Sequence, residues 1–505
     1  MLRFIDQWIG RTTMYRLVLY YLLALLGGAF LLGMFRTLAI DPTALVFSAV
    51  LVTAACWVAN LVFARVFGAV PNHESVYITA VILTLILDPT TATNLPGVGL
   101  LLFASVWAMA SKFILAARRR HIFNPAAIGV ALPGLLLAQP ATWWISTVTP
   151  LLPVILIGGL LLIRKLRRFD LILAFAAANL LTTLLTSAPG DALMEMRLTM
   201  LESPFLFFAF VMLTEPLTAP QHKLWRVVYA ALVGVLASPN VQVAGYYFTP
   251  EVALLVGNLL TFAVSPQGRV MLTLERIEEA ASGAYDFVFR PDRRLTFAAG
   301  QYLEWTLPVR RPDDRGNRRY FTIASGPVDE NVRLGVKFAA EGSAFKRELA
   351  ELRPGDSIVA SQLAGSFTLP ADPTKKLAFI AGGIGITPFR SMLEDLLDRG
   401  EPRNITVLYG NRHASEIAYR NVLDEARLRL GVMSYYAVQD PDGSSPAMHI
   451  GFVDEEMIRA TVTDFAERTF YVSGPQSMVD GERRLLRRLG VPFWRIKTDF
   501  FPGLA

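Results

Sequence analysis

The sequence has few residues that could hold a metal ion or form a disulfide. It contains one cysteine, Cys56, and five histidines, at positions 73, 121, 222, 413 and 449. One cysteine can neither form an intramolecular disulfide nor supply the four thiolates of an iron–sulfur cluster. The three histidines of the first half flank apolar stretches, and none pairs with another across a helix, so bis-histidine haem has no ligands. We expect no metal site, so any redox chemistry must come from an organic cofactor.

Charge is also scarce in the first half of the chain. The 505 residues are 53% hydrophobic and 18% charged, with a mean hydropathy of +0.41. Residues 1–265 are almost continuously apolar, whereas residues 268–505 have the mixed charge of a soluble fold. The first apolar run is too long for a signal peptide and lacks a small-residue cleavage site. The net charge is +6, and the basic residues of the first half lie at the ends of its apolar segments. This placement indicates that they set membrane topology, so we expect no nucleic-acid partner.

The first half is predicted to be a polytopic α-helical domain in the lipid bilayer. Its ten apolar segments are residues 15–35, 44–64, 75–88, 97–117, 124–139, 143–163, 169–187, 203–214, 224–239 and 248–264. Several reach the roughly 20 residues that span a hydrocarbon core. The segments 75–88, 124–139 and 203–214 are too short, which is typical of helices that end at an internal site.

Basic residues gather in alternate connectors between these segments. With the N-terminus inside, the inward connectors hold Arg65, Lys112, Arg118, Arg119, Arg120, Arg164, Lys165, Arg167, Arg168, Lys223 and Arg226. The outward connectors hold only Arg36 and Arg197. The positive-inside rule therefore predicts a multi-pass protein of the cell (inner) membrane, with both termini and the second half in the cytoplasm.

Two motifs recur at nearly the same interval. Asp88-Pro89-Thr90-Thr91-Ala92 returns as Glu215-Pro216-Leu217-Thr218-Ala219, and Phe123-Asn124-Pro125 returns as Phe248-Thr249-Pro250. Five segments followed by five more predict an inverted repeat with a binding site near the membrane midplane. Asn124, Glu215 and Thr218 are the candidate ligand residues of that site. Asp88 and Glu215 are each either an interfacial end-cap or a functional carboxylate.

The second half is predicted to contain two domains. Short alternating segments over residues 268–372, separated by glycine and proline, indicate a small antiparallel β-barrel. Over residues 373–505, apolar strands alternate with glycine turns and helices, which is typical of an α/β doubly wound domain. The complete prediction is a membrane domain over residues 1–265 fused to these two domains.

A flavin clamp is predicted on the strand that carries Arg319, Tyr320, Phe321, Thr322 and Ser325. A guanidinium can bind the pyrophosphate of FAD through two hydrogen bonds, and an aromatic ring can lie against the isoalloxazine. The threonine hydroxyl can hydrogen-bond near N5, the atom that accepts a hydride. Gly342 and Ser343 precede a helix and are candidate phosphate ligands.

A dinucleotide turn is predicted 56 residues after the clamp. Its residues are Gly382, Gly383, Gly385, Thr387 and Pro388. Glycine lets the backbone approach a pyrophosphate without a Cβ in the way, and proline suits the first turn of the following helix. Further candidates at strand ends are Tyr409, Asn411 and Arg412 for the adenosine ribose, and Ser473, Gly474, Pro475 and Met478 for the nicotinamide. Arg412 either neutralises a 2′-phosphate or is a solvated loop residue, which leaves NADH and NADPH both open.

The second half resembles the ferredoxin–NADP reductase superfamily in the type, order and spacing of these motifs. The resemblance implies FAD and NAD(P)H as cofactors and a catalytic role for Thr322. It also assigns such a role to Ser473, which stands where that superfamily commonly has cysteine.

The first half resembles a family of membrane components shared by the Rnf electron-transport complex and the sodium-pumping NADH:quinone reductase. The stretches that carry this resemblance are 121–127, 207–210 and 214–220. It implies a flavin inside the bilayer. The Ser-Gly-Ala-Thr run that holds covalent FMN in that family is absent, so we expect non-covalent FMN or riboflavin.

These inferences predict a membrane flavin oxidoreductase. It would take a hydride from NAD(P)H onto FAD and pass electrons through the membrane domain to a quinone or an extracytoplasmic flavoprotein. The alternatives are an inverted-repeat solute transporter regulated by a reductase domain, and a ferric or oxygen reductase without haem.

Overall fold

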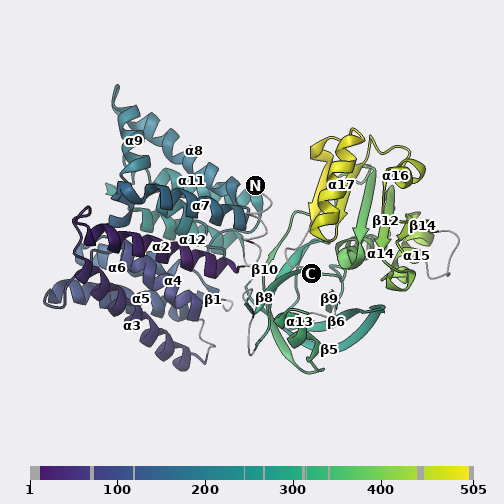
Figure 1. Cartoon of the computed structure of the whole chain (residues 1–505), viewed down its shortest axis with the longest axis horizontal. Coiled ribbons are helices and arrows are strands. Elements are labelled where there is room, and N and C mark those ends of the chain that lie inside the picture. Colours follow the sequence, from purple (N-terminus) through teal and green to yellow (C-terminus); the bar gives the residue numbers. More distant parts are fainter. Residues whose placement is uncertain are drawn as a thin grey trace. The chain divides into compact units, whose positions relative to one another are not determined.

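The computed structural model describes most of the chain, namely residues 9, 12–68, 73–117, 120–243, 245–265, 268–309, 313, 316–338, 342–440 and 448–499. Arg118 and Arg119, used above for topology, lie outside these ranges. The chain forms two compact units, Met1–Gly268 and Arg269–Ala505. Figure 1 labels their helices and strands.

The first unit is built of helices. They are α2 (Met14–Met34), α3 (Pro42–Val66), α4 (His73–Ile86), α5 (Leu95–Ile114), α6 (Pro125–Leu137), α7 (Leu152–Leu166), α8 (Phe169–Thr186), α9 (Ala192–Leu201), α10 (Phe205–Phe207), α11 (Lys223–Leu236) and α12 (Pro250–Val264). Capping residues begin several of them. The side chains of Asp41, Asn94 and Asn124 accept backbone N–H groups at the starts of α3, α5 and α6, each followed by a proline in the first turn.

Among the described residues, five helical stretches are long and apolar enough to cross a membrane. They are Met14–Met34, Pro42–Val66, Leu95–Ile114, Thr149–Leu166 and Phe169–Thr186. Glu74–Ile86, Pro125–Leu137 and Pro250–Val264 are shorter apolar helices. Every predicted apolar segment overlaps helix, but ten crossings stay a prediction. Segment 203–214 forms only α10 and one π-helical turn, η3 (Phe208–Met212), and α9 was not predicted as a segment.

The two halves of this unit repeat their order of elements. A two-stranded hairpin, β1 (Ala116–Ala117) with β2 (Arg120–His121), precedes α6, and β3 (Gln242–Val243) with β4 (Tyr246–Tyr247) precedes α12. The hairpins begin 126 residues apart and the two helices 125 residues apart. α3 packs on α5 and α5 on α6, as α8 packs on α11 and α11 on α12. This repetition supports an internal duplication.

The second unit begins with an antiparallel sheet. Its strands are β5 (Val270–Ala281), β6 (Ala284–Pro291), β7 (Tyr302–Thr306), β8 (Arg318–Thr322), β9 (Val332–Lys337) and β10 (Ser357–Ala364), in the spatial order β8-β7-β10-β5-β6-β9. Helix α13 (Ala344–Ala350) lies between β9 and β10 in sequence. Alternating apolar residues such as Leu272, Leu274, Phe287 and Phe289 form the core with Trp305 and Phe345. Closure of this sheet into a barrel stays a prediction.

A parallel sheet follows in the same unit. Its strands are β11 (Leu377–Gly382), β12 (Ile405–Asn411), β13 (Met433–Val438), β14 (His449–Ile450), β15 (Thr469–Ser473) and β16 (Ile496–Asp499), in the order β14-β13-β12-β11-β15-β16. The helices are α14 (Thr387–Arg399), α15 (Arg420–Leu430), α16 (Glu455–Thr461) and α17 (Gln476–Arg488). Separate apolar clusters cover the strands. The strand order reverses between β11 and β15, so the crevice at their carboxyl ends is where such sheets bind ligands.

Candidate active site

Strand β8 presents two different faces. Arg319 and Phe321 are two residues apart and share the face directed at α13, where the Phe345 ring lies 5.7 Å from the Phe321 ring and 5.4 Å from the Arg319 guanidinium carbon. Tyr320 lies on the other face, and its hydroxyl donates to Glu304 Oε2 at 2.9 Å. The structure therefore brings Arg319 and Phe321 together and separates Tyr320 from them.

The Arg319 guanidinium already binds an anionic group. Its Nη2 donates to Asp313 Oδ1 at 3.0 Å, and the backbone N–H of Ala344 donates to Asp313 Oδ2 at 3.2 Å. Arg319 and the start of α13 thus bind one carboxylate together, which is the donor set that a phosphate group would need. Ser343 caps α13 through Lys346 N, and the carbonyl of Gly342 accepts from Arg347.

The Thr322 hydroxyl is buried without a hydrogen-bond partner among the described residues. Leaving such a group unpaired costs free energy, so an unpaired hydroxyl beside a predicted cofactor suits a ligand contact. Ser325 differs, because its hydroxyl accepts from Arg333 N at 3.2 Å and is already used. Arg319 and Phe321 on one face of β8, with Thr322 at its last position, supply residue types that fit FAD.

The glycine turn lies at the reversal point of the parallel sheet. A Cβ on Gly385 would lie 2.6 Å from Gly474 Cα and from Ser473 O, and one on Gly382 would lie 2.1 Å from Met478 Sδ. These glycines therefore let the ends of β11 and β15 touch. Gly383 is different, since it has a φ of +52° and open space where a Cβ would be. That position leaves backbone open to a ligand.

Thr387 and Pro388 begin α14 directly after this turn. Thr387 is buried and its hydroxyl donates to Ile384 O at 3.2 Å, so it stabilises the turn. Pro388 occupies the first turn of the helix, where its missing N–H costs nothing.

Hydrogen bonds join the flavin strand to the glycine turn. Arg390 and Ser391 of α14 donate to the carbonyls of Ala324 and Ser325, which directly follow β8. The two motifs predicted from sequence are therefore held by one helix.

Tyr419 adds a second connection between the two sheets. Its hydroxyl donates to Asp286 of β6, and its ring lies 5.1 Å from the Arg390 guanidinium carbon. Burial, together with the neighbouring Asp286 carboxylate, raises the pKa of the Tyr419 hydroxyl well above its usual value. The hydroxyl therefore stays a proton donor to Asp286.

The carboxyl end of β12 holds the predicted ribose contacts. Tyr409 is fully buried, donates to Gly383 O at 3.0 Å and accepts from Ala418 N, so it positions the glycine turn. Both polar atoms of the buried Asn411 side chain lack partners among the described residues, which suits a nucleotide contact. Arg412 is exposed and its Nε donates to Asp440 Oδ2 at 3.1 Å.

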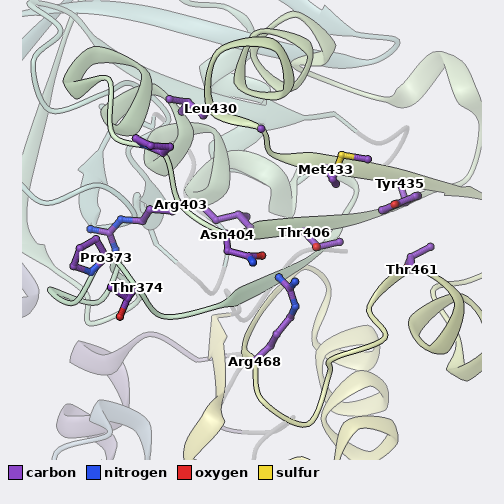
Figure 2. A pocket seen from close by; sticks show the side chains of 13 residues that line it. Pro373, Thr374, Arg403, Asn404, Thr406, Leu430, Met433, Tyr435, Thr461 and Arg468 are labelled. Atoms are coloured by element: carbon purple, nitrogen blue, oxygen red, sulfur yellow. The ribbon is translucent and has the colours of Figure 1, made fainter.

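A hollow of about 580 Å³ lies at the other end of the strands of this sheet, away from the glycine turn (Figure 2). It is lined by residues at the amino ends of β12 and β13, including Asn404, Thr406 and Met433, and by the buried Arg403 and Arg468. Both arginines are held by carboxylates, Arg403 by Glu401 and Arg468 by Asp464. Ligands of such sheets bind at the carboxyl ends, so this hollow is separate from the dinucleotide site.

The membrane unit gathers its own polar cluster. Glu215 Oε2 accepts from Asn124 Nδ2 at 2.9 Å and from Thr218 Oγ1 at 2.8 Å, and Glu215 Oε1 lies 3.4 Å from His121 Nε2. Asn258 of α12 accepts from Asn124 N at 2.8 Å and donates to Thr218 O. The three residues predicted from the repeat therefore meet. Asp88, the counterpart of Glu215, is exposed.

Sequence reasoning missed four residues of these sites, namely His121, Asn258, Asp313 and Arg390. His121 lies in a stretch that carries the family resemblance, but in sequence it only flanks an apolar run. Asn258 carries a usable signal, because a lone asparagine inside an apolar helix needs a partner. The partners of Asp313 and Arg390 depend on contacts between distant elements.

Comparison with known proteins agrees with both resemblances. Residues 146–265 match the NQR2, RnfD, RnfE family, and residues 379–484 match the oxidoreductase NAD-binding domain. The resemblances predicted for the two halves are thereby confirmed over these residues. The matches support an oxidoreductase with membrane helices that uses FAD and NAD(P)H as cofactors.

Relatives of the second half include reductases. A flavohemoprotein of Pseudomonas putida is 28% identical over 236 residues, which are 46% of this chain and 59% of that protein. The reductase component DmpP of phenol 2-monooxygenase, from a Pseudomonas species, is 30% identical over 192 residues, 37% of this chain and 53% of that protein. The chain thus spans between half and three-fifths of these relatives. The FAD/NAD-binding domain of nitric oxide dioxygenase from Vibrio cholerae aligns with 46% of this chain and 98% of its own, at 20% identity and a TM-score of 0.41.

Proposed function

We propose that this protein takes a hydride from cytoplasmic NAD(P)H onto FAD and passes electrons through its membrane unit to a quinone or an extracytoplasmic flavoprotein. The observation that carries the proposal is the link between the two motifs. Arg390 and Ser391 of the helix that follows the glycine turn bind the carbonyls of Ala324 and Ser325, which follow the flavin strand. A hydride donor and acceptor must meet within a few ångströms, and this link supports a fixed separation.

FAD, when bound, accepts a hydride and releases electrons one at a time. Arg319 would hold its pyrophosphate in place of the Asp313 carboxylate, and Phe321 would lie against its ring system. The unpaired Thr322 hydroxyl would donate to the cofactor where the hydride arrives. These three residues bind and orient the cofactor, and the chemistry is that of the cofactor itself.

The dinucleotide would be held at the crevice between β11 and β15. Gly383 offers open backbone for the pyrophosphate, and Asn411 has two unpaired polar atoms for the adenosine side. The buried Ser473 ends β15 beside Gly385 and would face the nicotinamide. Arg412 and Asp440 form an exposed ion pair, and such pairs are weak. Arg412 could therefore leave Asp440 to bind the 2′-phosphate of NADPH or stay paired when NADH binds.

The membrane unit would bind a non-covalent FMN or riboflavin beside Asn124, Glu215 and Thr218. These residues come from segments far apart in sequence and form one polar cluster in an apolar unit. Polar groups among apolar helices are costly unless they are paired or bind a ligand, which supports a functional site. In this proposal the protein lies in the inner membrane with both termini and the reductase unit in the cytoplasm.

Two measurements on the full-length protein test the proposal. The flavin absorbance should bleach when NADH or NADPH is added without oxygen. Acid extraction followed by chromatography should recover FAD together with FMN or riboflavin. FAD alone would reduce the protein to a cytoplasmic reductase on a membrane anchor, and a flavin spectrum that stays unbleached would refute the hydride step. Solute uptake into liposomes without NAD(P)H would favour the transporter.

A further inference from the structure

Helix α17 carries an exposed basic face. Its buried residues are Val479, Glu482, Leu485 and Leu486, and the three apolar ones belong to a core cluster of the parallel sheet. Arg483, Arg484, Arg487 and Arg488 are all exposed. Because residues three and four apart share a helix face, these side chains form one cluster, the α17 arginine face.

Several exposed arginines on other helices of this unit are paired with a carboxylate. Arg399 of α14, Arg429 of α15 and Arg459 of α16 each form an ion pair with a carboxylate four residues earlier. Among the described residues, no carboxylate forms an ion pair with any arginine of the α17 arginine face. Cations near a helix C-terminus favour the helix dipole, but one or two would serve that purpose. The α17 arginine face thus leaves positive charge uncompensated.

A hollow lies at the end of this face that is marked by Gly481. The hollow has a volume of about 450 Å³ and is lined by Gly481, Arg484, Arg487 and Arg488. A helix is less stable with glycine than with alanine at an interior position. At Gly481, an added Cβ would have no other atom within 4 Å. Close packing therefore does not require glycine at this position. Its effect is a recess large enough for a phosphate group. Three arginines line this recess, and their guanidinium groups bind phosphate well.

We propose that the α17 arginine face docks on anionic phospholipid headgroups, with one phosphate in the recess at Gly481. The unit that carries α17 is covalently continuous with a unit that has membrane helices, so an anionic bilayer surface is always at high local concentration. Each arginine near such a surface strengthens the attraction by about fivefold. The attraction is electrostatic, so salt should weaken it.

The test uses full-length protein in phosphatidylcholine nanodiscs, which leave the soluble unit free to bind added vesicles. Co-sedimentation should occur with vesicles of phosphatidylcholine and phosphatidylglycerol, and should be weak with pure phosphatidylcholine. The triple variant Arg484→Gln, Arg487→Gln and Arg488→Gln should lose affinity by on the order of a hundredfold. Arg459→Gln is the matched control, because it removes an exposed arginine that is already paired, and it should bind as the unmodified protein does.

Gly481→Ala separates lipid binding from folding. Alanine should raise the melting temperature while filling part of the recess, so weaker vesicle binding by a more stable protein supports the proposal. Vesicle binding that is unaffected by the triple variant would overturn it. Binding of inorganic phosphate without any binding of vesicles would also overturn it, because the recess would then be a site for a small anion.

Discussion

Some candidate cofactor residues of the two units differ in how their polar groups are paired. In the soluble unit, the Thr322 hydroxyl and the Asn411 amide are buried without partners among the described residues. In the membrane unit, Glu215 is in contact with His121, Asn124 and Thr218. The Thr322 hydroxyl and the Asn411 amide are therefore free to bind a ligand, whereas Arg319 and the Glu215 cluster must exchange existing contacts to bind one.

The largest expected effect is on the stability of the protein at high pH and comes from Glu482 of α17. This carboxylate is buried and one of its oxygens has no partner among the described residues, unlike the carboxylate of Glu215. Burial, and then the nearby Asp454 carboxylate, raises the pKa of Glu482 from 4.5 to about 8. Because the pKa is higher in the folded state, the stabilisation is complete below pH 4.5 and is lost as the pH rises through about 8. Glu482→Gln should remove this loss, which amounts to at most about 5 kcal/mol in the free energy of unfolding. Calorimetry at pH 4 and pH 9 should show equal melting temperatures at pH 4 and a higher one for the variant at pH 9.

Removing a cofactor contact should have the next largest effect. Arg319→Gln should weaken FAD binding by about 10- to 100-fold, because a charged hydrogen-bond donor to the pyrophosphate is lost. Fluorescence titration of flavin-free protein measures this affinity. Arg399→Gln, on an exposed ion pair of the same unit, is the control. Equal affinity in both variants would place the pyrophosphate elsewhere.

The two copies of the repeat should respond differently to the same change. Glu215→Ala removes the acceptor for Asn124 and Thr218 and should destabilise the membrane unit by about 1–3 kcal/mol. Asp88→Ala changes an exposed residue and should cost under about 0.5 kcal/mol. Thermal denaturation in nanodiscs measures both. Similar losses of stability in the two variants would show that Asp88 and Glu215, each followed by proline, are equivalent helix end-caps.

The contact between the ends of β11 and β15 can be broken by one methyl group. Gly385→Ala should destabilise the soluble unit by about 1–3 kcal/mol and raise the Km for NAD(P)H, because its Cβ would overlap Gly474. Gly410→Ala is the matched control, since its Cβ would make only an ordinary contact 3.7 Å from Val453. A Gly385→Ala enzyme with normal Km and stability would refute the close approach.

Thr322→Val should separate activity from stability. The variant removes a buried hydroxyl that has no partner among the described residues, so the protein should keep or slightly increase its stability. Hydride transfer, followed by stopped-flow bleaching of the flavin, should slow by about tenfold because a hydrogen bond to the cofactor is lost. Loss of stability with an unchanged rate would assign Thr322 to the fold alone.

Local signals explain how much of the molecule could be predicted. Apolar runs predicted the positions of the membrane helices, because burial in lipid requires continuous hydrophobicity. Asn124 before Pro125 predicted the start of α6, and Gly385 with Gly474 marked strand ends that now lie in contact. Helix α9 and the two hairpins were missed because they lack a strong apolar pattern.

The face of β8 and the position of Tyr409 required the structure. Tyr320 and Phe321 are adjacent and both aromatic, and only the packing of α13 shows that Phe321 joins Arg319. The ribose contact of Tyr409 stays a prediction, and the structure adds that its hydroxyl is bonded to Gly383 and Ala418. Strand direction and helix packing decide such choices, and neither is encoded in a short motif.

The sequence alone determined the division into an apolar and a mixed-charge half and the residue types available for a flavin and a dinucleotide. These follow from composition and from short-range rules of backbone geometry. Only the tertiary structure decided that Arg390 links the two soluble motifs, that Glu215 is bound by partners from other segments, and that Asp88 is exposed. Such pairings join residues tens to hundreds of positions apart, and they depend on how whole elements pack.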